Sequence, residues 1–292
     1  QILGMPVQFT TMGIGYNIKM FLEAGIDIPP NSWNLDIFIK YLSKIYYYES
    51  SKKKQDPSYR HNFTIQDINY PVPQLVPDLW DYETGKIKKD KKNDFISIHE
   101  KLQKMYSYLP APEEVQEVTG TATGQTSFFI MQKTYLNMTY AWQLIDLNAV
   151  KDLEWDITEE PHPGNNLYRG YTGYLALASI SKNKDEAYKF MQFYVNQKNA
   201  DLFSRMQNGM SARISSTGKF FIPPPRNISI YINTGKNHTL CNLRPNLKNW
   251  QEFNKKLKDI VGYDFIKGKM SAVKYADIYF QESDKMLEPY KK

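Results

Sequence analysis

The segment from residue 169 to residue 206 constrains the fold of this chain more than any other. Its run Leu175–Ile180 is short and apolar, which predicts a β-strand. A polar turn follows, in which Asn183 and Glu186 have the spacing of a helix N-terminal capping box. Beyond the turn, apolar side chains recur at helical spacing, which predicts one long amphipathic helix with one face on a core. These side chains are Ala187, Phe190, Met191, Tyr194, Val195, Leu202, Phe203 and Met206.

Strand and helix patterns alternate along the rest of the chain, which favours an α/β or α+β fold. Turn chemistry predicts a hairpin at 81–86, the polar residues 49–70 predict an exposed excursion, and Ser32 is a predicted N-cap. Further strands are predicted at 5–12, 128–131 and 135–138. Helices are predicted at 18–24, 33–46, 95–106, 142–147, 250–262 and 271–287.

Composition excludes several classes of function. The single cysteine, Cys241, allows no internal disulfide and no cysteine-based metal site, and none of the four histidines belongs to an H-x-x-x-H pair. No metal and no other cofactor is therefore predicted. The formal charge of +6 comes from lysines scattered over loops, without a basic helix that carries stacking aromatics, which argues against nucleic acid. No apolar run approaches the about 20 residues of a membrane span.

Several short motifs have the order and spacing of one known family. Residues 3–26 are similar to a stretch in which a strand crosses between lobes and continues as "YN-x-x-x-F-x-x-A-G". Residues 29–33 resemble the "P-x-T-W" that precedes the next helix, and residues 137–142 resemble a "G-x-W-A/x-W" segment that presents a ligand-stacking aromatic. Looser matches lie at 123–130, 210–213 and 244–250. Together these segments resemble the extracellular solute-binding proteins of carbohydrate-type ABC importers.

The resemblance implies an α/β fold of the two-lobe, periplasmic-binding-protein-like type (type II), with hinge crossings between the lobes. It places lobe 1 at 1–11 and 172–240, and lobe 2 at 12–171 and 241–292. The family has an N-terminal βα region before this point, so we expect the N-terminal lobe to be incomplete by roughly a hundred residues. The chain begins with Gln1 and shows no secretion signal, which agrees with an incomplete N-terminus.

The resemblance also implies a function. It predicts a non-catalytic, monomeric protein that binds a carbohydrate, and preferably an oligosaccharide, between its lobes. Closure of the lobes around the ligand would present the closed form to the permease subunits of an ABC transporter. The expected location is extracellular or periplasmic, as a lipoprotein whose lipid anchor lies outside this chain. Two alternatives stay open, a carbohydrate-active enzyme (glycosidase) and a sugar-sensing ectodomain with the same fold.

A sugar offers apolar C–H faces ringed by hydroxyls, so its site needs flat aromatic rings and fixed polar groups. Trp142, with Tyr140 beside it, matches the stacking position of the family, although a core tryptophan is an equal alternative. Trp250 lies near the return to lobe 2 and also fits a packing stripe of its helix. Trp80 lies among turn residues, where it either binds as an exposed ring or anchors the loop. Trp33 and Trp155 are assigned to packing.

The presumed crossings between lobes supply the remaining candidate residues, because polar groups there can reach a ligand bound between domains. For Arg169 a surface ion pair is an equal alternative. The candidates at the first crossing are Thr10, Thr11 and Met12. Those at the second crossing are Arg169, Tyr171 and Thr172.

Enzyme motifs are weak in this sequence. Residues 120–127 superficially resemble a phosphate-binding loop but lack its lysine, and their glycines are one residue too close. A glycosidase needs two carboxyl groups about 5–9.5 Å apart around a cleft. The adjacent Glu159 and Glu160 precede a proline and are typical of a loop, so no residue is predicted to be catalytic.

Overall fold

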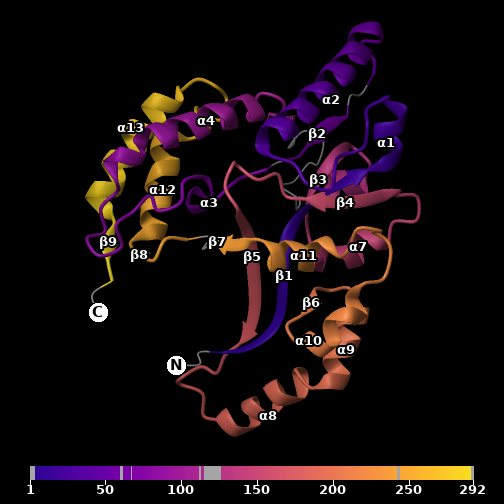
Figure 1. The fold of residues 1–292 in the computed structure, drawn as a ribbon, viewed down its shortest axis with the longest axis vertical. Helices are drawn as coiled ribbons and strands as arrows, with labels where there is room; N and C mark the ends of the chain where they lie inside the picture. Colours follow the sequence, from indigo (N-terminus) through magenta and orange to yellow (C-terminus); the bar gives the residue numbers. More distant parts are fainter. Residues whose placement is uncertain are drawn as a thin grey trace. The chain divides into compact units, whose positions relative to one another are not determined.

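The computed structural model describes residues 4–59, 62–66, 68–111, 113–114, 126–241 and 244–290 (Figure 1). The chain forms two compact units. Unit 1 consists of Gln1–Ser32, Thr123–Glu160 and Tyr168–Leu240, and unit 2 of Trp33–Ala122, Pro161–Leu167 and Cys241–Lys292. Both units contain helices and strands, as the α/β class requires. Residues 120–125, which belong to the run that resembles a phosphate-binding loop and to one of the loose family matches, lie outside the described residues.

The boundaries of the two units differ from the predicted boundaries of the lobes. Contacts group residues 123–160 with the N-terminal strand, whereas the predicted boundaries put them in lobe 2. The assignment of 1–11 and 172–240 to one lobe stays a prediction.

Unit 1 is built around β1 (Met5–Asn17), a strand of 13 residues. Its C-terminal half pairs antiparallel with β3 (Thr134–Tyr140) on one side and β4 (Trp155–Glu159) on the other. Its N-terminal half pairs with β5 (Leu167–Leu175) and β6 (Met210–Ser211). The other elements of this unit are α1 (Ile18–Glu23), α6 (Thr126–Ile130), η2 (Ala141–Gln143), α7 (Leu144–Asn148), α8 (Lys184–Tyr194), α9 (Gln197–Arg205), α10 (Ile214–Thr217), η3 (Gly218–Phe220), α11 (Ile230–Asn237) and β7 (Thr239–Cys241).

Glycines let the centre of β1 pack closely. A Cβ atom on Gly13 would lie 2.7 Å from Ile157 Cδ1, and one on Gly15 would lie 2.7 Å from Thr139 Oγ1. The alternate residues Ile14 and Tyr16 are buried. The missing Cβ atoms therefore leave room for the side chains of Ile157 on β4 and Thr139 on β3.

The predicted helix of 183–206 is two helices, α8 and α9, which corrects the sequence interpretation. α8 ends at Tyr194 with Val195 as its C-cap, and Asn196 caps α9, because its side chain accepts the N–H of Asn199 at 2.9 Å. The predicted cap Asn183 makes no such bond. The predicted strand at 175–180 is also wrong, since β5 ends at Leu175 and the next five residues belong to no strand.

Unit 2 is mainly helical. Its elements are α2 (Leu35–Gln55), β2 (Phe63–Ile65), α3 (Val72–Leu75), η1 (Lys89–Lys91), α4 (Lys92–Tyr106), β8 (Leu247–Lys248), α12 (Trp250–Val261), α13 (Ala272–Met286) and β9 (Glu288–Pro289). The helices predicted at 95–106, 250–262 and 271–287 are confirmed. The hairpin predicted at 81–86 is confirmed as well, with Trp80 and Ile87 bridged across a turn whose Gly85 has φ of +73°.

Three local predictions in the first half of the chain are corrected. Asn34, not Ser32, caps α2, because its side chain accepts the N–H of Ile37 at 2.9 Å. The segment 49–70, predicted as an exposed excursion, begins as helix, since α2 continues to Gln55. Glu49 within it is buried and accepts hydrogen bonds from the Tyr59 hydroxyl and the backbone N–H of Asn62. β2 is also buried within that segment. The strand predicted at 128–131 is largely α6.

His99 lies in an aromatic core between α4 and α13. Its ring stacks on Phe95 at 3.9 Å and contacts Tyr275 and Phe265. Nδ1 lies 2.7 Å from the carbonyl oxygen of Phe95, so the neutral ring carries its proton there. Burial lowers the pKa of His99 from 6.5 to about 4, although that hydrogen bond acts in the opposite direction.

Acid is therefore expected to destabilise unit 2 through His99. The unfolded chain binds the proton at a pH where the folded chain does not, so the contribution is full above pH 6.5 and is lost as the pH falls toward 4. The loss amounts to about 3 kcal/mol at most. Urea unfolding at pH 7.5 and pH 4.5 measures it, with His99→Phe as the control. A variant that loses as much stability as the wild type between these two pH values would contradict the assignment.

Within the described ranges, no helix combines the length and the apolar character that crossing a membrane requires.

Candidate functional site

Three aromatic side chains of unit 1 form a half-buried group, which we call the aromatic cluster: Tyr140, Trp142 and Tyr171. The rings of Tyr140 and Trp142 stack with their centroids 4.5 Å apart and their planes 4° from parallel. Tyr171 stands edge-on to both, 5.3 Å from Tyr140 and 5.8 Å from Trp142. The cluster is thus a rigid aromatic surface that solvent reaches in part.

Local structure explains why these rings meet. β3 ends at Tyr140, and the 3-10 turn that follows carries Trp142 two residues further. The side chain of Gln143 accepts the N–H of Tyr140 at 2.8 Å, which fixes the turn. Tyr171 comes from β5, where it lies opposite Thr10 in the ladder with β1. Two strands and a capped turn therefore hold the cluster in place.

Behind the cluster lies a buried ion pair. Glu160 Oε1 accepts the Nε–H of Arg169 at 2.7 Å and lies 2.5 Å from Nη2, and Arg169 is 2% exposed. Burial acts to lower the pKa of Arg169, but the charge and hydrogen bond of Glu160 outweigh it and raise the pKa overall. The guanidinium is therefore charged and occupied by Glu160. The ion pair was one of the two predicted roles, and it is buried rather than on the surface.

The phenol groups of the cluster provide polar atoms. The hydroxyls of Tyr140 and Tyr171 lie 3.5 Å apart. Burial raises the pKa of Tyr140 above its ordinary value, and the nearby charge of Arg169 acts in the opposite direction. The Tyr140 hydroxyl therefore keeps its proton at neutral pH and can donate a hydrogen bond.

The other predicted crossing residues support the cluster from inside the unit. Thr10 Oγ1 accepts the N–H of Ala141 at 3.2 Å and donates to the carbonyl of Thr11 at 2.7 Å. Thr11 Oγ1 donates to the carbonyl of Tyr231 at 2.8 Å, and the side chain of Met12 is buried. Thr172, in contrast, is exposed on β5. Direct contact of these four residues with a ligand stays a prediction.

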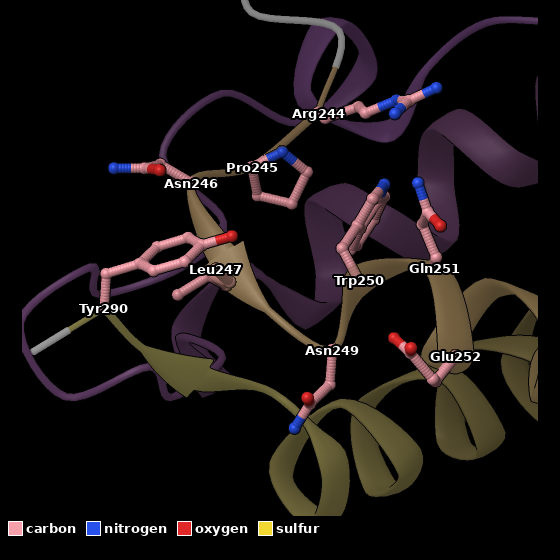
Figure 2. A pocket seen from close by; sticks show the side chains of 9 residues that line it. All are labelled: Arg244, Pro245, Asn246, Leu247, Asn249, Trp250, Gln251, Glu252 and Tyr290. Carbon is pink, nitrogen blue, oxygen red and sulfur yellow. The ribbon is translucent and has the colours of Figure 1, made fainter. Parts of the chain in front are cut away.

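Unit 2 has a pocket of its own, of about 600 Å³, near the end of the chain (Figure 2). In the view of Figure 2 the indole of Trp250 stands between the Pro245 ring and the side chain of Gln251. β8 pairs with β9, so that Leu247 lies opposite Pro289 and Tyr290 reaches the pocket. The lining residues are Arg244, Pro245, Asn246, Leu247, Asn249, Trp250, Gln251, Glu252 and Tyr290. The pocket thus combines two aromatic rings with amides and charged groups.

Of the two alternatives predicted for Trp80, the structure has the loop anchor and not the exposed ring. It is 2% exposed, and its Nε1–H donates to Ser283 Oγ at 3.0 Å. Its ring packs edge-on against Trp250 at 5.6 Å and contacts Tyr279 at 6.4 Å. Trp80 therefore anchors its loop and supports the half-buried Trp250 from behind.

Sequence reasoning identified Trp250 but missed the rest of its pocket. Arg244 was part of a motif that was matched to the family, yet it was given no role of its own. Tyr290 had no signal, because its contribution depends on the pairing of β8 with β9 across some forty residues of chain. The packing roles predicted for Trp33 and Trp155 are confirmed, since both side chains are buried.

Comparison with known proteins identifies the class of fold. No protein-family model matches the chain, and no curated protein sequence matches it. Solved structures do match. An ABC substrate-binding protein from Listeria monocytogenes, solved in complex with cycloalternan, superposes with a TM-score of 0.76 at 15% identity, over 97% of this chain and 71% of that one.

Two further solved structures have the same fold. The GacH receptor of Streptomyces glaucescens, solved unliganded and in complex with acarbose, gives a TM-score of 0.69 at 14% identity, over 99% of this chain and 72% of that one. A family 1 extracellular solute-binding protein from Alicyclobacillus acidocaldarius gives 0.60 at 14% identity, over 97% and 71%. The chain therefore has the periplasmic-binding-protein-like fold of the family 1 extracellular solute-binding proteins, as the motifs predict. It spans somewhat more than 70% of the length of the matched chains.

Proposed function

We propose that this protein binds a carbohydrate without converting it and delivers it to the permease of an ABC transporter. One observation carries the proposal. The aromatic cluster offers two stacked rings and a third ring at right angles to them, partly open to solvent. Solved proteins with the same fold support it, since two of them are described in complex with cycloalternan and with acarbose.

The chemistry of the cluster suits a sugar. A pyranose ring presents a flat C–H face that packs on an indole or a phenol, and its hydroxyls need fixed polar partners. Trp142 supplies the stacking surface, and the ring of Tyr140, stacked on it, fixes the orientation of the indole. The hydroxyls of Tyr140 and Tyr171, and that of the exposed Thr172, supply hydrogen bonds at the rim. The buried Thr10, Thr11, Met12 and Arg169 support these groups from inside the unit, and their direct contact with the ligand stays a prediction.

The pocket of unit 2 is the second surface that we assign to the carbohydrate. Trp250 and Tyr290 are its rings, and Asn246, Gln251 and Glu252 are neutral and acidic partners for hydroxyls. Trp80 acts through Trp250. An oligosaccharide has enough sugar units to use more than one aromatic ring, which favours it over a monosaccharide. Binding between two closing lobes stays a prediction.

Replacement of Trp142 by alanine tests the proposal. We expect the affinity for the bound sugar to fall about tenfold or more, a loss of at least about 1.4 kcal/mol, because the stacking face is removed. Isothermal titration calorimetry measures this, and a cooperative melt of the variant shows that the fold is intact. Tyr263→Ala removes a half-exposed ring from the turn that follows α12 and should leave the affinity unchanged. Equal affinity of Trp142→Ala and the wild type would remove Trp142 from the site.

Turnover separates binding from catalysis. We expect oligosaccharides to be recovered intact after incubation with the protein, without new reducing ends. Their hydrolysis would favour the glycosidase alternative. A location outside the cytoplasmic membrane and attachment as a lipoprotein are part of the same proposal, and membrane fractionation of the source cells tests them.

A further inference from the structure

The outward side of α2 carries lysines and a tyrosine in one row along the helix. We call this surface the α2 outer face, and its residues are Lys40, Lys44, Tyr47, Ser51 and Lys54, all exposed. Steps of four and three residues place them on one side of the helix. The opposite side holds the buried residues Leu35, Phe38, Leu42, Ile45 and Glu49. The inner side of α2 therefore packs on unit 2, and its outer side is basic and aromatic.

The positive charge of α2 is not balanced among the described residues. Glu49 is the one carboxylate between residues 40 and 55, and it is buried. Asp56, just beyond the helix, accepts hydrogen bonds from Ser58. No ion pair within the described ranges includes a lysine of residues 40–55. These lysines are Lys40, Lys44, Lys52, Lys53 and Lys54.

Helix chemistry explains only a part of this pattern. Lys52, Lys53 and Lys54 lie in the last turn, where the helix dipole favours positive charge. Lys40 and Lys44 lie far from that end, and like charges four residues apart destabilise a helix. Sequence patterns separate the two groups, because they assign 49–70 to an excursion, whereas the structure joins both groups on one helix. A surface that keeps this repulsion is complementary to an anionic partner.

Tyrosines give the same surface a second property. Tyr46 and Tyr47 are 42% and 64% exposed, and the centroids of their rings lie 5.6 and 6.3 Å from that of Tyr108. An apolar ring with a hydroxyl at its tip suits the headgroup level of a membrane. From Lys40 to Lys54 the face is about 21 Å long, which fits a broad surface better than a small ligand. In Figure 1 the last turns of α2 extend beyond the other helices of its unit.

We infer that the α2 outer face docks on a bilayer that contains anionic lipids. The lysines contact the lipid phosphates, and Tyr46 and Tyr47 lie among the headgroups. The face rests on the bilayer without crossing it, because the charged ends of its lysines stay in water. A soluble polyanion and an acidic surface of another protein are the competing partners.

Vesicle sedimentation tests the inference on the protein expressed from its complete gene, without attached lipid. At low salt we expect binding to vesicles of phosphatidylglycerol and phosphatidylcholine in equal parts, and none to phosphatidylcholine alone. The variant Lys40→Gln/Lys44→Gln/Lys54→Gln should bind the anionic vesicles about a hundredfold more weakly, since each lysine near such a surface contributes about fivefold. Tyr46→Ser/Tyr47→Ser should also weaken this binding, but not binding to polyphosphate.

A matched control removes the same charge elsewhere. Lys255→Gln/Lys258→Gln/Lys274→Gln changes exposed lysines of α12 and α13 and should leave vesicle binding nearly unchanged. All the replaced side chains are exposed, so we expect every variant to melt as the wild type does and to keep its sugar affinity. The outcome is therefore independent of the proposed function.

Four results would overturn the inference. The first is a wild-type protein that does not bind the anionic vesicles, which would favour an acidic protein as the partner. The second is equal vesicle binding of the wild type and the variant of the α2 outer face. The third is an equal loss in the control, which would assign the effect to net charge. The fourth is a tyrosine variant that binds the vesicles as the wild type does, which would favour a site for any polyanion.

Discussion

Replacement of Glu160 by glutamine is expected to destabilise unit 1 by about 3–5 kcal/mol. The Glu160 carboxylate is fully buried and accepts the Nε–H of Arg169, which is itself 2% exposed. Glutamine keeps the size of the side chain but removes its charge. The guanidinium then stays buried without a counter-ion, and the cost of desolvating it is no longer offset.

A double variant separates the effect of the lost charge on stability from the effect of changed packing. The double variant Glu160→Leu/Arg169→Met removes both charges and keeps the volume, so we expect it to recover most of the lost stability. Urea unfolding followed by circular dichroism measures all three proteins. A loss below about 1 kcal/mol in Glu160→Gln, within the range of exposed pairs, would contradict the buried pair. Because the pair lies behind Tyr140 and Tyr171, we also expect sugar affinity to fall in Glu160→Gln.

Replacement of Trp80 by alanine is expected to destabilise unit 2 by about 3–5 kcal/mol. The indole is 2% exposed, contacts Trp250 and Tyr279, and donates a hydrogen bond to Ser283. Its removal leaves a large cavity and an unpaired hydroxyl. Trp250 also loses the ring that supports it, so the pocket of unit 2 should lose its shape.

Trp80→Phe is the matched control, because it retains a ring but not the N–H group. We expect a smaller loss of stability, and a partial loss of sugar affinity if Trp250 takes part in binding. Thermal unfolding measures the first effect and calorimetric titration the second. Equal stability of Trp80→Ala and the wild type would contradict the buried position of Trp80.

Local patterns predicted the elements whose partners lie close in the chain. The helices at 95–106, 250–262 and 271–287 have clear apolar stripes, and each helix buries most of its stripe within unit 2. The hairpin at 81–86 depends on turn residues alone, which act over a few positions. The family fold was predictable because its motifs occur in order along nearly the whole chain.

Predictions failed where the structure depends on distant partners. The run 175–180 has strand composition, but a strand requires a neighbour, and beyond Leu175 the described residues supply none. Glu49 is buried because Tyr59 folds back onto α2, which no helical pattern indicates. Trp80 is buried because α13 lies over its hairpin, more than two hundred residues along the chain. The aromatic cluster was predicted in part, since Tyr140, Trp142 and Tyr171 were all candidates, but their stacking geometry was not.

The most direct test of carbohydrate binding is a thermal-shift screen of the protein, expressed from its complete gene, against mono- and oligosaccharides. A ligand present at about 100 times its Kd adds about 2.7 kcal/mol to the stability of the folded state. We predict a selective rise of the melting midpoint with one class of oligosaccharide, and a rise of about half that size or smaller in Trp142→Ala at the same ligand concentration. A cooperative melt whose midpoint no sugar in the panel raises would contradict carbohydrate binding.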